Sequence, residues 1–306
     1  MTSGEFIGLT LTPMAIAVLA AIVCALPGNF LLLRRQALLG DAISHVVLPG
    51  VVLAFLITGA MAAWPMMIGA AVAALIAVAL IEAIVRFGAV EPGAAMGVVF
   101  TALFAAGVLL LEQSGASNVH FDVEHALYGN LESLIWLDAV FVDDLFAAEA
   151  LLGLPPQLPR LVVVLIGFLA ALAVCWRLLA ITTFDPDYAR AVGAPVGATA
   201  VCLAGAAAIA AVAAFDAVGA VIVIAMFICP PATARLVTDS LPRQVGLSAG
   251  FAASAAIFGF ALADLGPRWV AGGGAVSAAG AIATAAGAQL LIAALIGPRR
   301  REVAPR

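Results

Sequence analysis

The segment from Arg34 to Gly50 contains the side chains with the clearest capacity for chemistry. Asp41 and His45 are four residues apart, so on a helix they share one face and can reach one ion together. Carboxylate oxygen and imidazole nitrogen suit Mn²⁺, Zn²⁺ or Fe²⁺, whereas alkali ions prefer oxygen alone and thiolates favour copper. The pair lies in an apolar run, where ionisable groups are costly unless they are paired or functional. We therefore predict a metal site, with a helix-packing Asp–His pair as the alternative.

Two ligands are too few to hold a metal ion. A symmetric dimer with this helix at its twofold axis would bring two Asp41 and two His45 side chains together, which makes four ligands. An ion in transit must also bind weakly enough to leave. The pair therefore fits a translocation path better than a permanently bound cofactor.

A second cluster of candidate ligands lies in the long acidic stretch at about 112–159. His120, Asp122, Glu124 and His125 fall within six residues. Residues two apart share a face only if the segment is extended. The cluster is either an outer metal relay or docking patch, or a solvated acidic loop.

The third segment of interest runs from Phe184 to Gly193 and reads FDPDYARAVG. Asp185 suits an N-cap, Pro186 suits the first helical position and Gly193 can end a helix. The pattern predicts a short capped helix of about two turns. It is either an ordinary helical loop or an element that docks on a soluble partner, and the residues leave both readings open.

Composition shows which elements must position these side chains. The 306 residues are 65% hydrophobic and only 10% charged, far from the average of a soluble domain. Apolar runs of membrane-spanning length recur throughout, so we predict an all-α, polytopic membrane bundle of eight or nine helices in a single domain over residues 1–306. The expected spans are about 9–33, 39–58, 64–85, 94–111, 161–181, 192–214, 218–228, 247–262 and 272–296. The 218–228 segment is short, and we expect Pro230 and Pro231 to end it as a half-helix or to break a longer one.

Arginine placement predicts the orientation, because cytoplasmic loops of membrane proteins are rich in cations. If Arg34 and Arg35 are cytoplasmic and the spans alternate, only Arg160 and Arg268 fall outside. This asymmetry needs an odd number of spans, with the C-terminus cytoplasmic and the acidic 112–159 stretch outside. Asp216 then lies near an outer span end, where pairing or snorkelling explains it.

The sequence also excludes several classes of function. It has no HExxH or P-loop motif and no basic patch of the kind that nucleic acid needs. Any energy for transport must come from a partner or a gradient. A proton-coupled secondary metal transporter and a non-transporting membrane scaffold therefore remain alternatives.

Four blocks, in order, resemble the permease subunits of bacterial manganese/zinc/iron-type ABC importers. They are RRQALLGDAISHVVLPGVVLAF, FDVEHALYGNLE, FDPDYARAVGAPV and VGAVIVIAMFICPPATARLVTD, and the resemblance extends from about residue 10 to residue 300. It implies a fold like that of type II ABC importer permeases in the bacterial inner membrane. It also implies a permease without an ATPase site of its own.

The resemblance implies partners and roles that the residues alone do not. A cytoplasmic ATP-binding subunit, a periplasmic or lipid-anchored metal-binding protein and a second permease copy, identical or a paralogue, are expected beside the membrane lipid. Asp41 and His45 match the family's Asp-x-x-x-His on the translocation path. The coupling helix that fits the ATPase is matched by Phe184, Asp185, Pro186, Asp187, Ala189, Arg190 and Gly193. The block from Asp122 to His125 matches a family motif to which the residues assign no role. The choice among zinc, manganese and iron stays open.

Overall fold

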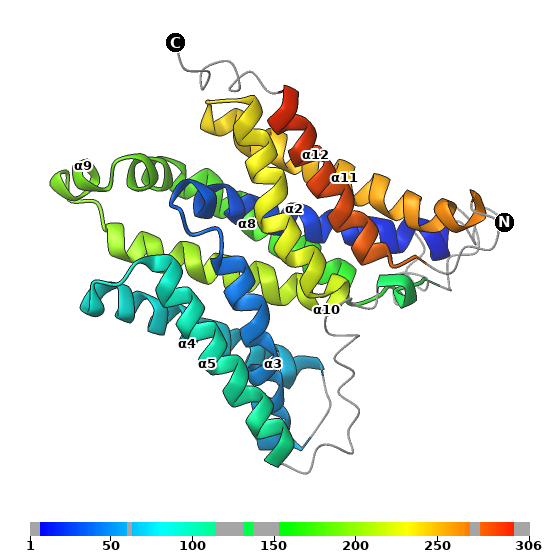
Figure 1. Ribbon diagram of the computed structural model, residues 1–306, viewed down its shortest axis with the longest axis horizontal. Coiled ribbons are helices and arrows are strands. Elements are labelled where there is room, and N and C mark those ends of the chain that lie inside the picture. Colours follow the sequence, from blue (N-terminus) through cyan, green and yellow to red (C-terminus); the bar gives the residue numbers. More distant parts are fainter. Residues whose placement is uncertain (1–6, 60–62, 114–130, 137–152, 270–275, 297–306) are drawn as a thin grey trace. The chain divides into compact units, whose positions relative to one another are not determined.

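The described part of the chain is built from helices alone. The computed structural model describes residues 7–59, 63–113, 131–136, 153–269 and 276–296 (Figure 1). Eight helices in these ranges are long and apolar enough to cross a membrane. This confirms the predicted all-α membrane fold. The elements are η1 (Ile7–Leu11), α2 (Thr12–Leu33), α3 (Leu39–Thr58), α4 (Ala63–Gly88), α5 (Pro92–Gln113), η3 (Leu131–Ser133), α8 (Gln157–Phe184), α9 (Pro186–Ala191), α10 (Val196–Val237), α11 (Leu241–Trp269) and α12 (Ala278–Ile296).

The helices group into two compact units. One comprises Pro27–Val123 and Ala170–Val212, and it contains α3, α4, α5 and α9. The other comprises Met1–Leu26, Glu124–Leu169 and Ala213–Arg306, and it contains α11 and α12. The metal-site and coupling candidates that the structure describes, Asp41, His45 and the 184–193 segment, all belong to the first unit.

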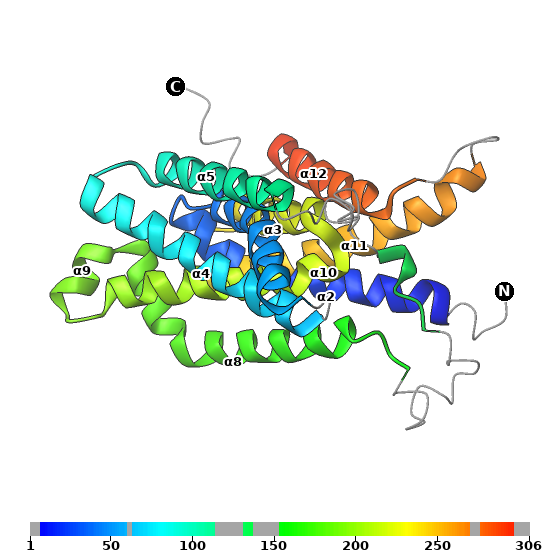
Figure 2. The same ribbon diagram turned by 90° about the horizontal axis from the view of Figure 1, so that it is seen from below.

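In the first unit, α3 packs against both α4 and α5 (Figures 1 and 2). Glycines allow this close approach. A Cβ atom on Gly50 of α3 would lie 2.5 Å from the carbonyl oxygen of Gly69 on α4, and one on Gly107 of α5 would lie 2.5 Å from Pro49 Cβ. Small residues at helix contacts permit such backbone proximity in membranes. The three helices are therefore held together at Pro49 and Gly50, one turn beyond His45.

In α10 the structure has a break close to the boundary between the spans predicted at 192–214 and 218–228, and it extends the second of them to Val237. The helix runs from Val196 to Val237, and its only non-helical backbone is at Gly219, with φ 74° and ψ 174°. Pro230 and Pro231 lie inside the helix and do not end it. Of the two predictions for this segment, the one in which the helix continues beyond the prolines is therefore correct, although the prolines do not break it. Prolines are tolerated in membrane helices where neighbouring groups satisfy the freed carbonyls. The break falls at glycine because a positive φ is cheap only there.

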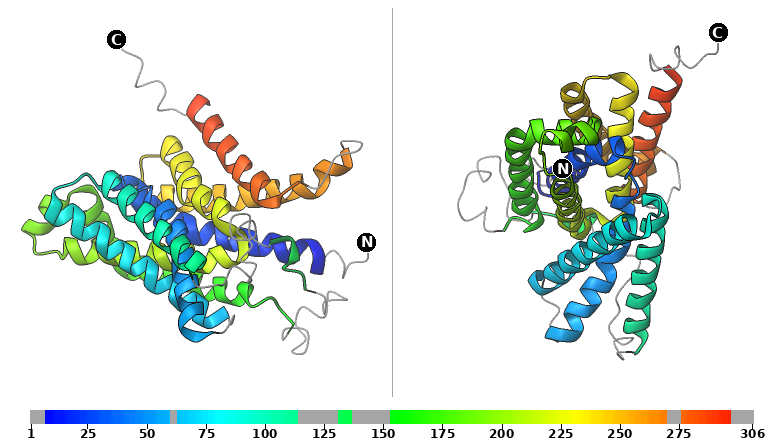
Figure 3. Two further views of the ribbon diagram at one scale, coloured as in Figure 1. Left: turned by 60° about the horizontal axis from the view of Figure 1, so that its bottom comes forward. Right: turned by 90° about the vertical axis from the view of Figure 1, so that its left-hand side faces the viewer.

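In the second unit, α11 and α12 pack against each other, coloured gold to orange and red in Figure 3. A Cβ atom on Gly259 would lie 2.7 Å from the backbone nitrogen of Ile282, so this glycine lets the two backbones meet. The side-chain amide of Gln289 also forms a 3.0 Å hydrogen bond with Ser254 Oγ. One close glycine contact and one polar contact thus join the pair.

Candidate functional site

The two predicted metal ligands lie at the start of α3. Asp41 is in the first turn of the helix, where the helix dipole stabilises a carboxylate. His45 follows one turn later on the same face, as its spacing predicted. The structure thus brings the two side chains together through local helix geometry alone.

The distance between the two side chains suits shared coordination of a metal ion. His45 Nε2 lies 3.4 Å from Asp41 Oδ1, longer than a strong hydrogen bond. Two ligands about 2.1 Å from one tetrahedral ion lie about 3.4 Å apart, so the observed spacing leaves room for a metal between them. The side chains are 34% and 29% exposed, respectively, so an ion can reach both.

Two aromatic rings of α5 border the imidazole of His45. Phe100 stacks on it with ring centroids 5.4 Å apart and ring planes 22° apart. Phe104, one turn further along α5, meets it edge-on at 5.8 Å with an interplanar angle of 77°. The two rings offer no ligand and shield one side of the imidazole from water. We did not predict this aromatic wall, formed by Phe100 and Phe104. The four-residue spacing of the two phenylalanines on a neighbouring span was the available signal.

Beyond His45 the side chains around α3 are almost all apolar. Pro49 has no N–H, so the carbonyl oxygen of His45 loses its usual helical donor. A cavity of about 590 Å³ begins at this turn between α3, α4 and α5. Its lining includes Val46, Leu53, Ile68 and Leu103. These side chains provide no metal ligand, so the candidate ligands on α3 are confined to its first two turns.

The metal site is incomplete within one copy of the described chain. No group of three His, Cys, Asp or Glu side chains in the described ranges is arranged to hold an ion. The pair of Asp41 and His45 therefore needs ligands from elsewhere. The predicted relay residues His120, Asp122, Glu124 and His125 lie outside the described residues, and so does most of the acidic stretch that contains them.

The predicted coupling segment forms the short helix α9, next to the end of α8 in Figure 2. The Asp185 carboxylate accepts a 2.9 Å hydrogen bond from Tyr188 N, and Pro186 occupies the first turn. Gly193 follows with φ 80°, a conformation that favours glycine. Asp187 and Arg190 form an ion pair on the exposed side. The sequence thus predicted both ends of this helix.

The exposed face of α9 is partly apolar. Phe184 at the end of α8, Tyr188 within α9 and Val192 directly after it are each more than half exposed. Ala189 is fully buried, so it anchors the helix and adds nothing to the exposed face. We did not single out Tyr188 and Val192 from the sequence, although the four-residue spacing from Phe184 was the available signal. Exposed apolar side chains on and beside a capped helix are suited to contact with another protein.

The comparison with known families decides the class of the protein. The ABC-3 profile, described as the ABC 3 transport family, matches residues 8–146 and 150–296. The chain belongs to this family. It is a membrane permease subunit and not itself the ATPase of an ABC transporter, which confirms the resemblance predicted from the four sequence blocks.

Individual relatives agree with this assignment over nearly the whole chain. The chain is 41% identical over 285 residues to the manganese transport system membrane protein MntD of Bacillus subtilis, which covers 93% of this chain and 91% of the relative. It is 38% identical over 291 residues to the zinc transport system membrane protein TroD of Treponema pallidum, with 95% and 75% covered. Among solved structures, PsaBC from Streptococcus pneumoniae in complex with Fab matches with a TM-score of 0.72 and 30% identity, over 95% of this chain and 92% of that one.

Proposed function

We propose that the chain is the membrane permease of an ATP-driven importer that moves a divalent transition metal ion across the bacterial inner membrane. The observation that carries this proposal is the Asp41–His45 pair, placed 3.4 Å apart at the start of a membrane helix in a permease of this family. Zinc, manganese and iron all accept oxygen and imidazole nitrogen ligands. The named functions of MntD and TroD support manganese and zinc as the leading cargoes.

Asp41 and His45 replace part of the hydration shell of the ion as it passes. Each copy of the chain supplies two ligands, so a second permease copy, identical or a paralogue, completes a set of four at a shared axis. The rings of Phe100 and Phe104 keep water from one side of the imidazole and fix its orientation. A site assembled from two copies can be opened by separating them, which lets the ion leave.

The helix α9 docks on a cytoplasmic ATP-binding subunit. Its side chains other than Ala189 are exposed, its N-terminus is capped by Asp185, and the exposed Phe184, Tyr188 and Val192 offer apolar contact area. ATP binding and hydrolysis in the partner move this helix, and the bundle alternates between outward-open and inward-open states. The segment Phe184, Asp185, Pro186, Asp187, Ala189, Arg190 and Gly193 forms this coupling element together with Tyr188 and Val192.

On the outer side, a periplasmic or lipid-anchored metal-binding protein delivers the ion. His120, Asp122, Glu124 and His125 are the proposed outer relay, because two imidazoles and two carboxylates follow one another in the acidic stretch. The relay holds the ion near the mouth of the path before Asp41 and His45 receive it. Replacing His120 and His125 together by alanine then weakens uptake most at low metal concentration.

The length of α10 supports the proposed orientation. Its 42 residues would extend about 63 Å if straight, roughly twice the thickness of a bilayer core. With the break at Gly219, we count two crossings for α10 and so nine for the eight candidate helices of the described residues. An odd number agrees with the arginine distribution and places the C-terminus in the cytoplasm.

Reconstitution tests the proposed function. The complex is purified from its own cells with its bound subunits and placed in proteoliposomes, and ⁵⁴Mn and ⁶⁵Zn transport is measured with ATP or with an imposed proton gradient. We expect one of the metals to move only when ATP is supplied. Transport driven by the proton gradient without ATP would support the secondary-transporter alternative, which no observation on the described residues favours. If neither of these metals nor ⁵⁵Fe²⁺ is transported under either condition, the result would contradict metal import.

A further inference from the structure

Arg34 lies just before α3, the helix that carries Asp41 and His45, and it contacts the end of α8, which leads into the coupling helix α9. It directly follows α2, and its guanidinium donates hydrogen bonds to two hydroxyl groups in the last turn of α8. Nη2 lies 2.8 Å from Thr182 Oγ1, and Nε lies 3.1 Å from Thr183 Oγ1. The two contacts join residues almost 150 positions apart within one compact unit.

The hydroxyl groups are positioned to accept these bonds. Thr182 Oγ1 donates its own proton to the carbonyl oxygen of Leu178 over 2.7 Å, so its lone pairs face the guanidinium. Thr182 is only 3% exposed, which protects the contact from competing water. Burial lowers the pKa of Arg34, and the negative charge of Glu82 partly opposes that effect. The guanidinium nevertheless keeps its charge at neutral pH.

Apolar packing supports the same junction. The rings of Phe30 on α2 and Trp176 on α8 meet edge to face, with centroids 6.3 Å apart and planes at 80°. Phe30 is one turn before Arg34 and fully buried. The ends of α2 and α8 are thus joined by an aromatic contact and two charge-assisted hydrogen bonds, which together oppose sliding of one helix along the other.

Short connections lead from the junction to both functional segments. Thr183 is two residues before Asp185, the cap of α9. In the other direction, residues 34–38 form a hydrogen-bonded turn in which Gln36 N bonds Leu31 O at 2.8 Å and Leu39 N bonds Gln36 O at 3.0 Å. Asp41 follows in the first turn of α3. A tight turn of this kind passes on a displacement that a flexible linker would absorb.

We propose that Arg34 is a positioning residue that transmits movement of α9 to α3, and so couples ATP hydrolysis to displacement of the metal ligands. This inference rests on the proposed function. The planar guanidinium fixes direction as well as distance, because its two donors are held in one rigid fork. A lysine at this position keeps the charge but not the fork.

The test compares Arg34→Lys with Arg35→Lys in the complete transporter, purified with its own subunits and reconstituted. Arg35 is the neighbouring, exposed arginine, so both variants keep the charge of the loop. ATP hydrolysis and ⁵⁴Mn or ⁶⁵Zn transport are measured in the same proteoliposomes. For Arg34→Lys we expect metal transported per ATP to fall about tenfold, the effect of losing one charged hydrogen bond, while hydrolysis continues. Arg35→Lys should match the wild type.

The double variant Thr182→Val, Thr183→Val removes the acceptors and leaves Arg34 in place. It should lower the same ratio and confirm that the contact, not the arginine alone, is responsible. An unchanged ratio in Arg34→Lys, or a proportional fall of hydrolysis and transport, would overturn the inference. A wild-type complex that hydrolyses ATP but moves none of manganese, zinc and iron would instead overturn the proposed function, and the coupling role with it.

Discussion

The imidazole of His45 lies nearly parallel to the ring of Phe100, with centroids 5.4 Å apart and planes 22° apart. One residue comes from the first half of α3 and the other from α5, so helix packing creates the contact. It places an aromatic face directly behind a candidate metal ligand. The orientation of that ligand therefore depends on a residue that cannot itself bind a metal.

Replacing Phe100 by leucine should weaken metal uptake without abolishing it. Loss of an aromatic contact of about 0.5–1.5 kcal/mol lets the imidazole rotate, so we expect the KM for metal uptake to rise about two- to tenfold. Initial uptake rates over a range of metal concentrations measure this. Phe258→Leu, at an exposed position of α11, is the matched control and should leave KM unchanged. Equal KM values for the two variants would argue against an orienting role of Phe100.

Gly107→Ala should destabilise the contact between α3 and α5. The added methyl group would lie 2.5 Å from Pro49 Cβ, and overpacking of this kind costs about 1–3 kcal/mol. We expect a lower midpoint of thermal unfolding in detergent and reduced uptake. Gly97→Ala on the same helix is the control, because nothing lies within 4 Å of its added methyl group. If the two variants had the same midpoint of thermal unfolding, the result would contradict the close packing of Gly107 against Pro49.

Asp185→Ala should impair the coupling helix. The substitution removes the acceptor for Tyr188 N and costs about 1 kcal/mol of helix stability. We expect less ATP-binding subunit to co-purify and a lower uptake rate. Asp185→Ser, which restores a capping oxygen, should recover most of both. The control Glu91→Ala removes an exposed carboxylate elsewhere, and a comparable loss there would mean that charge rather than capping matters.

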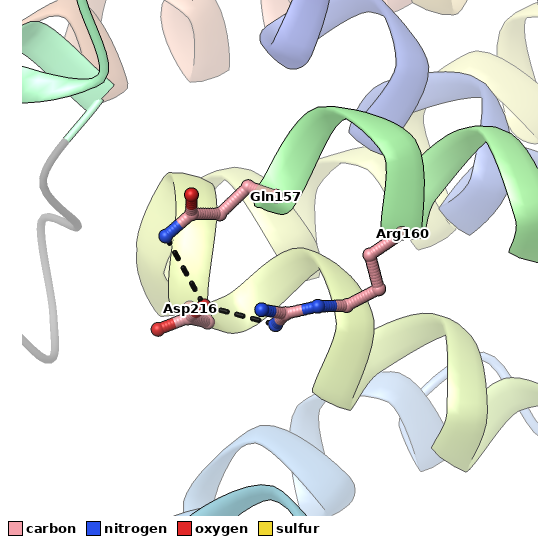
Figure 4. A network of polar contacts seen from close by, with 3 residues as sticks. All are labelled: Gln157, Arg160 and Asp216. Carbon is pink, nitrogen blue, oxygen red and sulfur yellow. Dashed lines mark hydrogen bonds and ion pairs between the residues drawn. The ribbon is translucent and has the colours of Figure 1, made fainter. Parts of the chain in front are cut away.

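The ion pair near the break in α10 gives a prediction about stability. Arg160 Nη1 lies 2.9 Å from Asp216 Oδ2, and Gln157 Nε2 lies 3.4 Å from the same oxygen (Figure 4). Asp216 is three residues before Gly219, so the pair ties the start of α8 to this bend. Arg160→Glu should lower the free energy of unfolding by about 1 kcal/mol, because the pair is partly exposed. Thermal unfolding measures the change.

The charge-swapped double variant Arg160→Glu, Asp216→Arg provides the control for that prediction. It keeps the net charge and restores an attractive pair, so part of the lost stability should return. A double variant less stable than either single variant would show that the two side chains do not act through their mutual attraction. The pairing itself was one of two sequence-based explanations for Asp216 at a span end, and the structure supports it.

Local patterns predicted much of the fold and of the site. The i, i+4 spacing of Asp41 and His45 and the Asp185–Pro186 cap each depend on one helix, so the sequence was sufficient. The wall of Phe100 and Phe104 and the junction at Arg34 depend on which helices pack together, and no local pattern specifies that. The break in α10 at Gly219 lies close to the predicted boundary between two spans, but Pro230 and Pro231, which were expected to end or break the second span, do neither. Surrounding groups can compensate for proline, and only glycine adopts the backbone of the break cheaply.

The most direct test of the central claim is ⁵⁴Mn and ⁶⁵Zn uptake in cells that carry the wild type, Asp41→Ala or His45→Ala. Each variant is first checked for normal abundance in the membrane, so that a folding defect is not mistaken for a transport defect. We predict that both variants lose uptake of the same metal by at least about tenfold, since each removes one ligand from every copy. Full uptake of both metals by both variants would contradict a metal path through Asp41 and His45 and leave the pair a helix-packing role.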